Sequence, residues 1–248
     1  MLRERPHPGG WLTLVSPKLE AIGVPHGFTT AVGPGPERWS VKSAEDMQGV
    51  LRGERLNDRR VAMGRQVHQA RVTTPAVRHQ HGCNEADAHV TDQYTEVVAV
   101  RTADCVPLLL SRADGFVVAA VHAGWRGLQA GVIAEALGVV ALRGDGPVDA
   151  SACVAAIGPC IGVDAYEVGE EVASQFSFGV ARRDDWPKPH LDLRGIALRQ
   201  LLDAGVSPDR IDVATQCTFA EVERFGSYRR DGRGCGHQAA FIGPIHKP

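Results

Sequence analysis

The sequence predicts a single α/β (α+β) domain in which helices pack on a mixed β-sheet. Strand-like and helix-like patterns alternate from Val67 onward, which is typical of mixed α/β proteins. The chain of 248 residues is 44% hydrophobic and 23% charged, which is the balance of an ordinary folded protein. Because no repeat, low-complexity tract or linker interrupts the sequence, we assign residues 1–248 to one domain.

The expected elements follow from hydrophobic periodicity and from turn residues. Residues 1–60 are rich in glycine and proline turns, and they predict only one short helix, from Ser43 to Gly53. A hairpin is expected where PLLLS and FVVAAVH flank the turn RADG. The other expected elements are strands at 67–74, 97–101, 153–158 and 210–217, a polar loop at 78–89, helices at 128–143, 165–176 and 193–205, and a glycine-rich loop between two short strands at 227–243.

The composition argues against some classes of binding partner. A formal net charge of −2 provides no long-range attraction to nucleic acid or to an anionic membrane. The basic N-terminus is followed by no apolar segment of a secretory signal, and no apolar stretch approaches the roughly 18 residues of a membrane span. Six cysteines in a chain of this length indicate reduced thiols. We therefore expect a cytoplasmic protein with a small-molecule substrate, no nucleic-acid or membrane partner, and an oligomeric state that the sequence leaves open.

Cys105 and His122 stand at the two open ends of the predicted hairpin. A turn centred between Ala113 and Asp114 places Cys105 directly opposite His122. Side chains in that position have Cβ atoms about 4.5–5.5 Å apart, so one ion or one hydrogen bond can join them. Two chemistries remain open: His122 activates Cys105 as a nucleophile, or both residues bind a metal such as zinc.

A third ligand would favour metal binding over the cysteine nucleophile. His68 lies at the start of another expected strand, which a sheet can place next to the hairpin. Two histidines and one thiolate leave the fourth position of a tetrahedral zinc open for water, which is the arrangement of a catalytic site. We expect zinc rather than copper, because a multicopper site needs many clustered histidines and this chain has ten, with a single H-x-H pair at His79 and His81.

Further polar residues flank these candidates. Asp104 is a candidate acid/base group or a hydrogen-bond acceptor behind the metal ligands. Arg126, Tyr228 and Arg229 are candidate substrate-binding residues, since arginine binds phosphate through two parallel hydrogen bonds. Structural explanations are preferred for the remaining candidates, namely a solvated loop for His79, His81, Cys83 and His89, core packing for Cys153 and Cys160, a surface turn for Cys235 and His237, and a helix start for Glu167.

The segments GRQVH, TADCVPLLL, VHAGWRG, GPCIGVDAYEVGEEV and SYRRDG together resemble the YfiH/YlmD-type family, over about residues 61–243. Members carry the domain name multicopper polyphenol oxidoreductase (laccase-like), and several are described as zinc-dependent purine nucleoside phosphorylases with adenosine deaminase activity. The resemblance implies the metal ligands His68, Cys105 and His122. Gln69 stands where the family usually has glycine, Ala31 where an arginine is expected, and residues 1–60 match poorly.

The sequence therefore leaves four functions open. The first is a zinc-dependent purine nucleoside phosphorylase with adenosine deaminase activity, in which Asp104 and Cys105 are catalytic. The second is a hydrolase that uses Cys105 and His122 on an amide, as in cell-wall precursor editing. The third is a copper-dependent polyphenol oxidase. The fourth is a binding module that zinc stabilises without catalysis.

Overall fold

The computed structural model describes residues 1–7, 9–33, 35, 37–54, 56–77 and 85–247. Two six-stranded sheets form its centre, and both mix parallel and antiparallel pairs. The mixed α/β class is therefore confirmed, although the strands divide between two sheets instead of forming one. Within the described ranges, no helix is both long and apolar enough to cross a membrane.

The first sheet has the strand order β1-β2-β3-β14-β7-β4. Three of its strands come from the N-terminal segment that was hardest to interpret from sequence, and β3 pairs with β14, more than 200 residues away. The strands are β1 (Arg3–Pro6), β2 (Leu12–Val15), β3 (His26–Thr29), β14 (Gln238–Ile242), β7 (Glu96–Thr102) and β4 (Arg60–Ala62).

The second sheet has the order β13-β10-β8-β9-β6-β5. Its central strands are buried on both faces, which explains their unbroken apolar sequences. The strands are β13 (Ile211–Val213), β10 (Cys153–Ile157), β8 (Val106–Arg112), β9 (Val118–Ala123), β6 (Ala88–Thr91) and β5 (Val72–Thr73). A separate pair joins β11 (Val180–Ala181) to β12 (His190–Leu191).

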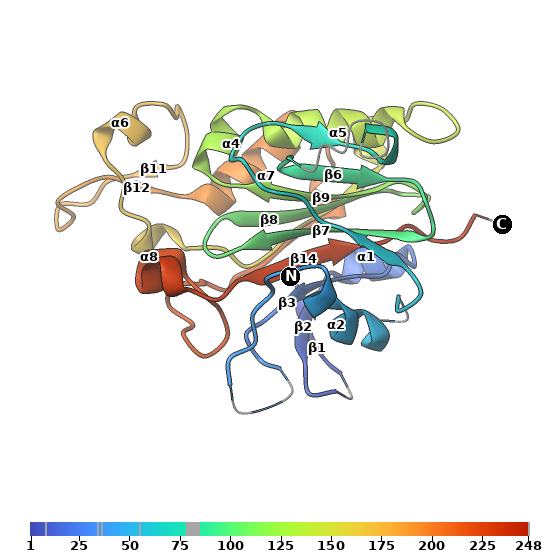
Figure 1. Cartoon of the computed structure of the whole chain (residues 1–248). Coiled ribbons are helices and arrows are strands. Elements are labelled where there is room, and N and C mark those ends of the chain that lie inside the picture. The colour runs from blue at the N-terminus through green and yellow to red at the C-terminus, as the bar shows by residue number, and fades with distance from the viewer. Residues whose placement is uncertain (8, 34, 36, 55, 78–84, 248) are drawn as a thin grey trace.

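Helices cover the outer faces of the two sheets. On β9, Ala119 and Val121 pack toward the helices, whereas Val118 and Ala120 pack toward the first sheet, as the two-residue period of a strand requires. Figure 1 shows α4, α5 and α7 on one side of the second sheet and the first sheet on its other side. The helices are α1 (Pro17–Ala21), α2 (Gln48–Gly53), α4 (Trp125–Gln129), α5 (Val132–Leu142), α6 (Glu170–Ala173), α7 (Leu193–Asp203) and α8 (Tyr228–Asp231).

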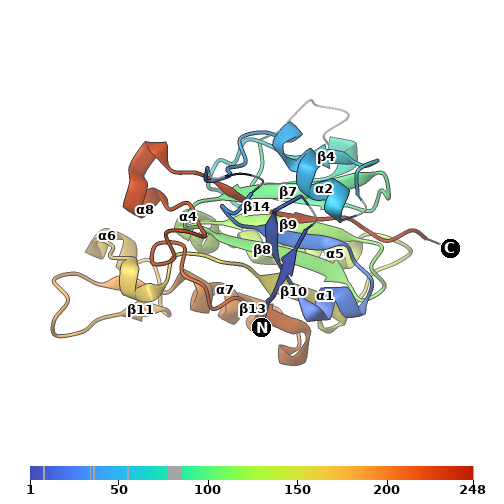
Figure 2. The same ribbon diagram turned by 90° about the horizontal axis from the view of Figure 1, so that it is seen from below.

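Several expected elements are shorter than the sequence indicated. The helix expected at 128–143 is broken at Gly131, whose φ of +82° ends α4 before α5 begins. The helix expected at 165–176 is only α6, preceded by a 3-10 turn over Val163–Ala165. Of the strand expected at 67–74 only β5 forms, because residues 67–69 fold around a buried carboxylate. Figures 1 and 2 both place α4, α6 and α8 at one end of the sheets.

A buried histidine on β3 gives the fold a defined response to acid. His26 accepts a hydrogen bond from the Ser16 N–H (2.7 Å) at Nε2 and donates one from Nδ1 to the Val24 carbonyl (2.8 Å). One nitrogen accepts and the other donates, so the imidazole ring is neutral in the folded protein. Burial lowers the pKa of His26 to about 4. Its stabilising contribution is complete above the unfolded pKa of about 6.5 and is lost as the pH falls toward 4, by about 2 kcal/mol at pH 5.

Urea unfolding of wild type and His26→Gln at pH 7.5 and at pH 5 tests this expectation. The variant loses hydrogen bonds and is less stable at pH 7.5, but glutamine does not titrate, so the gap between the two proteins should narrow at pH 5. A gap of the same size at both pH values would contradict the assignment.

Candidate metal centre

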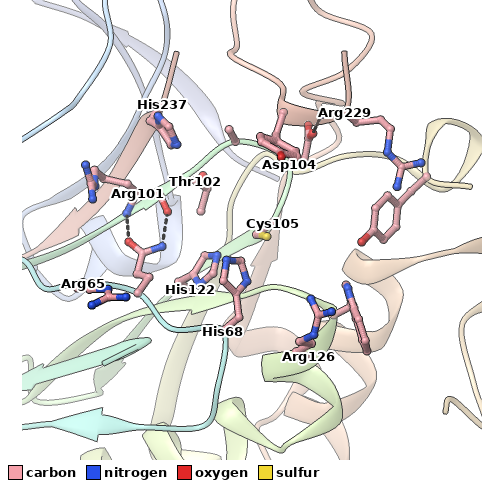
Figure 3. A pocket seen from close by; sticks show the side chains of 15 residues that line it. Arg65, His68, Arg101, Thr102, Asp104, Cys105, His122, Arg126, Arg229 and His237 are labelled. Carbon is pink, nitrogen blue, oxygen red and sulfur yellow. Dashed lines mark hydrogen bonds between the residues drawn. The ribbon is translucent and has the colours of Figure 1, made fainter. Parts of the chain in front are cut away.

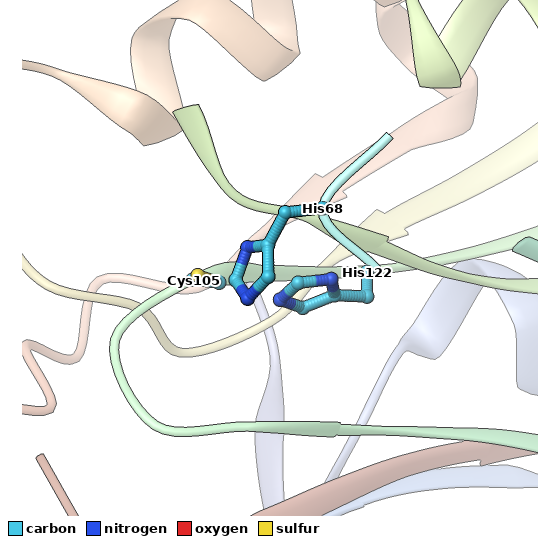
Figure 4. A group of neighbouring side chains, drawn as sticks. All are labelled: His68, Cys105 and His122. Carbon is cyan, nitrogen blue, oxygen red and sulfur yellow. The ribbon is translucent and has the colours of Figure 1, made fainter. Parts of the chain in front are cut away.

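His68, Cys105 and His122 bring their ligand atoms together at the end of the second sheet. One ligand atom from each residue lies within 4.8 Å of the other two, and Figure 4 shows the two rings and the sulfur turned toward one another. His68 comes from the loop before β5, Cys105 from the bend between β7 and β8, and His122 from β9. Two imidazoles and a thiol are a donor set that suits zinc. Among the described residues this is the one cluster of at least three such side chains.

The hairpin that joins Cys105 to His122 has a different register from the predicted one. Pro107, not Cys105, pairs with His122, and the loop is centred one residue later than expected. The reason is local: the Asp114 carboxylate accepts a hydrogen bond from the Phe116 N–H (3.0 Å), and Gly115 adopts a φ of +74°. The predicted register is wrong by two residues, but side chains alternate with a period of two, so Cys105 stays on the same side as His122.

Asp87 holds both histidines, and the sequence interpretation missed it. The carboxylate accepts hydrogen bonds from the backbone N–H groups of Val67 (3.2 Å), His68 (2.9 Å) and Gln69 (2.9 Å), and it pairs with His122 Nδ1 at 2.8 Å. These bonds hold His68 at a φ of +56°, which is uncommon for a residue with a side chain. The sequence offered one weak signal, an aspartate at the start of the apolar segment ADAHV.

The electrostatics of the cluster favour an ordered, charged arrangement. Burial disfavours a charged His122, but the Cys105 sulfur and the Asp87 carboxylate outweigh it and raise the pKa of His122 to about 9. Burial, followed by the nearby His122, lowers the pKa of His68. Because Nδ1 of His122 bonds to Asp87, its Nε2 is left for a metal, an arrangement common in zinc sites.

Asp104 connects the cysteine loop to α8. Its buried carboxylate accepts hydrogen bonds from Thr218 Oγ1 (2.7 Å), Ser227 Oγ (3.0 Å) and the Arg229 N–H (2.7 Å). The residue has a φ of +93°, so the surrounding contacts hold a strained backbone in place. These bonds fix the segment that carries Tyr228 and Arg229 beside Cys105.

A cavity of about 640 Å³ opens over His68, Cys105 and His122, as Figure 3 shows. It includes every site residue predicted from the sequence. Its lining residues are Arg65, Gln66, His68, Arg101, Thr102, Ala103, Asp104, Cys105, His122, Trp125, Arg126, Tyr166, Tyr228, Arg229 and His237. Of these, Arg65, Gln66, Arg101, Thr102 and Tyr166 were not foreseen, and His237 was assigned to a surface turn.

Aromatic rings and arginines stack at one side of the cavity. The Arg126 guanidinium lies 4.2 Å from the centroid of the Trp125 ring, and that of Arg229 lies 4.7 Å from the Tyr166 ring. Burial raises the pKa of Tyr166 to about 12. Flat aromatic and guanidinium surfaces of this kind bind nucleobases by stacking.

The outcome differs between the core cysteines and the loop at 78–89, to which sequence alone gives structural roles. Cys153 and Cys160 are fully buried, and burial raises both pKa values to about 11, as expected for core residues. His89 lies buried on β6, so its assignment to a solvated loop is wrong. The remaining residues of that loop, His79, His81 and Cys83, lie outside the described residues.

Known proteins resemble this chain in both sequence and fold. The profile of a family described as "Multi-copper polyphenol oxidoreductase laccase" matches residues 41–244, which is most of the chain. The chain belongs to this laccase-like family. The match begins about 20 residues earlier than the motifs indicated. The family's fold is also seen in the crystal structure of YlmD from Geobacillus stearothermophilus, with a TM-score of 0.83 and 26% identity over 98% of this chain and 99% of that one.

Two curated relatives of this laccase-like protein carry enzyme names. "Purine nucleoside phosphorylase" of Xylella fastidiosa (strain 9a5c) is 38% identical over 157 residues, 60% of this chain and 57% of that protein. The match thus spans less than two thirds of that relative's length. "Adenosine deaminase RL5" of an unknown prokaryotic organism is 35% identical over 202 residues, 75% of each chain.

Proposed function

We propose that the protein is a zinc-dependent purine nucleoside phosphorylase that also deaminates adenosine. The observation that carries the proposal is the cluster of His68, Cys105 and His122 at the floor of a cavity with aromatic and arginine walls. The names of the relatives support the same substrate class. From the composition we further propose that the enzyme works in the cytoplasm, where thiols stay reduced.

In this proposal, some residues of the cavity bind the metal and others orient the substrate. His68, Cys105 and His122 would hold the zinc, which when bound supplies a Lewis acid. Trp125 and Tyr166, with the arginines stacked on them, give the purine flat surfaces to lie against. Tyr228 stands at the rim with 57% of its surface exposed, where it can close over a bound nucleoside.

Asp104 takes a positioning role in this proposal. Its carboxylate already accepts three hydrogen bonds from Thr218, Ser227 and Arg229, so it is poorly placed to exchange a proton with a substrate. By fixing α8, it sets where Tyr228 and Arg229 meet the nucleoside. Asp104 thus contributes to turnover through the residues that it holds.

One observation favours the hydrolase alternative. Burial opposes a charged His122, but the neighbouring Cys105 sulfur contributes to raising the pKa of His122, which suits a nucleophile beside its base. A copper oxidase has less support, because a multicopper site requires several clusters and the described ranges contain one.

Metal removal separates these functions. We expect zinc-loaded protein to convert inosine to hypoxanthine and ribose 1-phosphate only when phosphate is present, and to convert adenosine to inosine without it. Chelation should abolish both reactions and zinc should restore them, with products followed by chromatography. Amide hydrolysis that survives chelation but not thiol alkylation would favour the Cys105–His122 hydrolase, and no nucleoside product under any metal would overturn the proposal.

A further inference from the structure

The charge of the cavity differs in sign from that of the whole protein. Four arginines line it, Arg65, Arg101, Arg126 and Arg229, whereas the chain carries a net charge of −2. Among the described lining residues the one carboxylate is Asp104, which is turned to its three hydrogen-bond donors. Arg65 forms an ion pair with Glu85 (3.0 Å), which lies outside the cavity lining, so the excess positive charge comes from the other three arginines. A cavity with this excess of cations attracts an anionic ligand.

The arginines lie on two sides of the metal-binding cluster. Figure 3 shows Arg126 and Arg229 on one side of His68 and His122, and Arg65, Arg101 and His237 on the other. The first pair is stacked on aromatic rings and belongs to the surface proposed for the purine. In the described part of the chain, neither Arg65 nor Arg101 stacks on an aromatic ring, so this side of the cavity offers charge and hydrogen-bond donors where the other side offers flat surfaces.

Arg101 is held firmly while most of its side-chain donors stay free. The Gln66 side chain bonds to both backbone groups of Arg101, accepting from its N–H (2.8 Å) and donating to its carbonyl (2.7 Å). The Arg101 guanidinium donates once, from Nη1 to the Lys42 carbonyl, and it forms no ion pair with a carboxylate in the described ranges. A guanidinium has five N–H donors, so several remain for a ligand.

The neighbours of Arg101 add to this anion-binding character. His237 is fixed through its backbone, because its N–H donates to Ser40 Oγ (2.9 Å) and its carbonyl accepts from the Val41 N–H (2.8 Å). Thr102 also lines the cavity, and its buried hydroxyl finds no hydrogen-bond partner among the described residues. An unpaired buried hydroxyl is unfavourable, and a ligand oxygen on this side of the cavity would offset that cost after rotation of the side chain.

We propose that Arg101, with Arg65, Thr102 and His237, forms the subsite for the phosphate dianion, separate from the purine surface. The inference rests on the proposed function, and the stereochemistry of phosphorolysis supports it. A phosphate oxygen forms a bond to the anomeric carbon as the bond from that carbon to purine N9 breaks, and the electron pair of that bond stays on the base. The proton that hydrogen phosphate gives up ends on the base, so the products are the free purine and ribose 1-phosphate. Phosphate that enters opposite the departing base lies across the sugar from the purine, and Arg101 with its neighbours lies across His68 and His122 from the surface proposed for the purine (Figure 3).

Kinetics of an Arg101→Gln variant test the subsite. We expect the KM for inorganic phosphate to rise by about tenfold or more, since a hydrogen bond to a charged group is lost. Deamination of adenosine consumes water instead of phosphate, so the ratio of phosphorolysis to deamination should fall. Arg199→Gln, on the exposed face of α7 and paired with Asp203, is the matched control and should leave both reactions unchanged.

Direct binding of inorganic phosphate to the zinc-loaded protein, measured by calorimetry without nucleoside, separates this inference from the proposed function. Weaker binding to Arg101→Gln and a smaller loss in Thr102→Val would support the subsite even in a protein that showed no phosphorolysis. Equal binding to wild type and Arg101→Gln would overturn it, even in an active phosphorylase. Binding of nucleoside 5′-monophosphates is measured in the same way. If Arg101→Gln weakens their binding while inorganic phosphate binds as before, these residues bind the phosphate of a nucleotide. The assignment to inorganic phosphate is then overturned.

Discussion

Replacing Asp87 by asparagine is expected to lower the affinity of the protein for zinc by about 10–100-fold. The carboxylate accepts hydrogen bonds from three consecutive backbone N–H groups of the His68 loop and pairs with Nδ1 of His122. An asparagine keeps the size of the side chain, but it turns an N–H₂ group toward donors that need an acceptor. The N–H₂ group must replace either the oxygen bonded to His68 and His122 or the oxygen bonded to Val67 and Gln69, so in either orientation the loop that carries His68 is held less firmly and the charge opposite His122 is lost. Competition with a chromogenic chelator measures the affinity.

Asp92→Asn is the matched control for this substitution. Asp92 pairs with Arg143 at 2.9 Å, and both side chains are partly exposed, so its removal should change stability by about 0.5 kcal/mol or less and leave zinc affinity unaltered. Thermal unfolding with and without chelator shows whether Asp87→Asn acts on the metal site or on the whole fold. An Asp87→Asn variant that binds zinc as tightly as wild type would contradict the positioning role.

The candidate site was predictable where it depends on local patterns. Cys105 and His122 are close because one hairpin joins them, and an error of two residues in its register kept both on one side. Asp87, Tyr166 and Arg101 were missed because their roles arise from contacts between segments distant in sequence, which periodicity does not encode. Asp87 reaches the His68 loop across about 20 residues, and Tyr166 lies in a segment that periodicity assigned to a helix.

The fold shows the same division between local and distant information. The long apolar strands β8 and β9 and the helix α7 lie close to the expected positions, because each signal is contained in its own segment. The N-terminal strands have four residues each, and β3 becomes a strand through pairing with β14 at the other end of the chain. Propensity within four residues does not specify such a partner.

Replacing Gly124 by alanine is expected to abolish zinc binding while the protein still folds. A Cβ atom at this position would lie 2.9 Å from Cys105 Sγ, closer than real Cβ contacts come, and 3.0 Å from His68 Nδ1, tighter than nearly all of them, so both side chains must shift. The backbone of Gly124, with φ −74° and ψ 171°, suits alanine, so the methyl group adds no strain of its own. Its effect therefore falls on the two ligands, and the loss of affinity should be at least as large as at Asp87.

Gly138→Ala provides the comparison that makes this expectation specific. Gly138 lies within α5, and a Cβ there meets no atom within 4 Å, so alanine should raise stability by about 0.5–1 kcal/mol through its helix propensity and leave zinc content unchanged. Metal analysis and urea unfolding of both variants, each with and without chelator, decide the matter. If Gly124→Ala retains a full equivalent of zinc, the three side chains do not bind the metal in the arrangement described. If it loses zinc but unfolds like the chelated wild type, the glycine of the HAGWRG segment is required because the metal site needs the space that a side chain would fill.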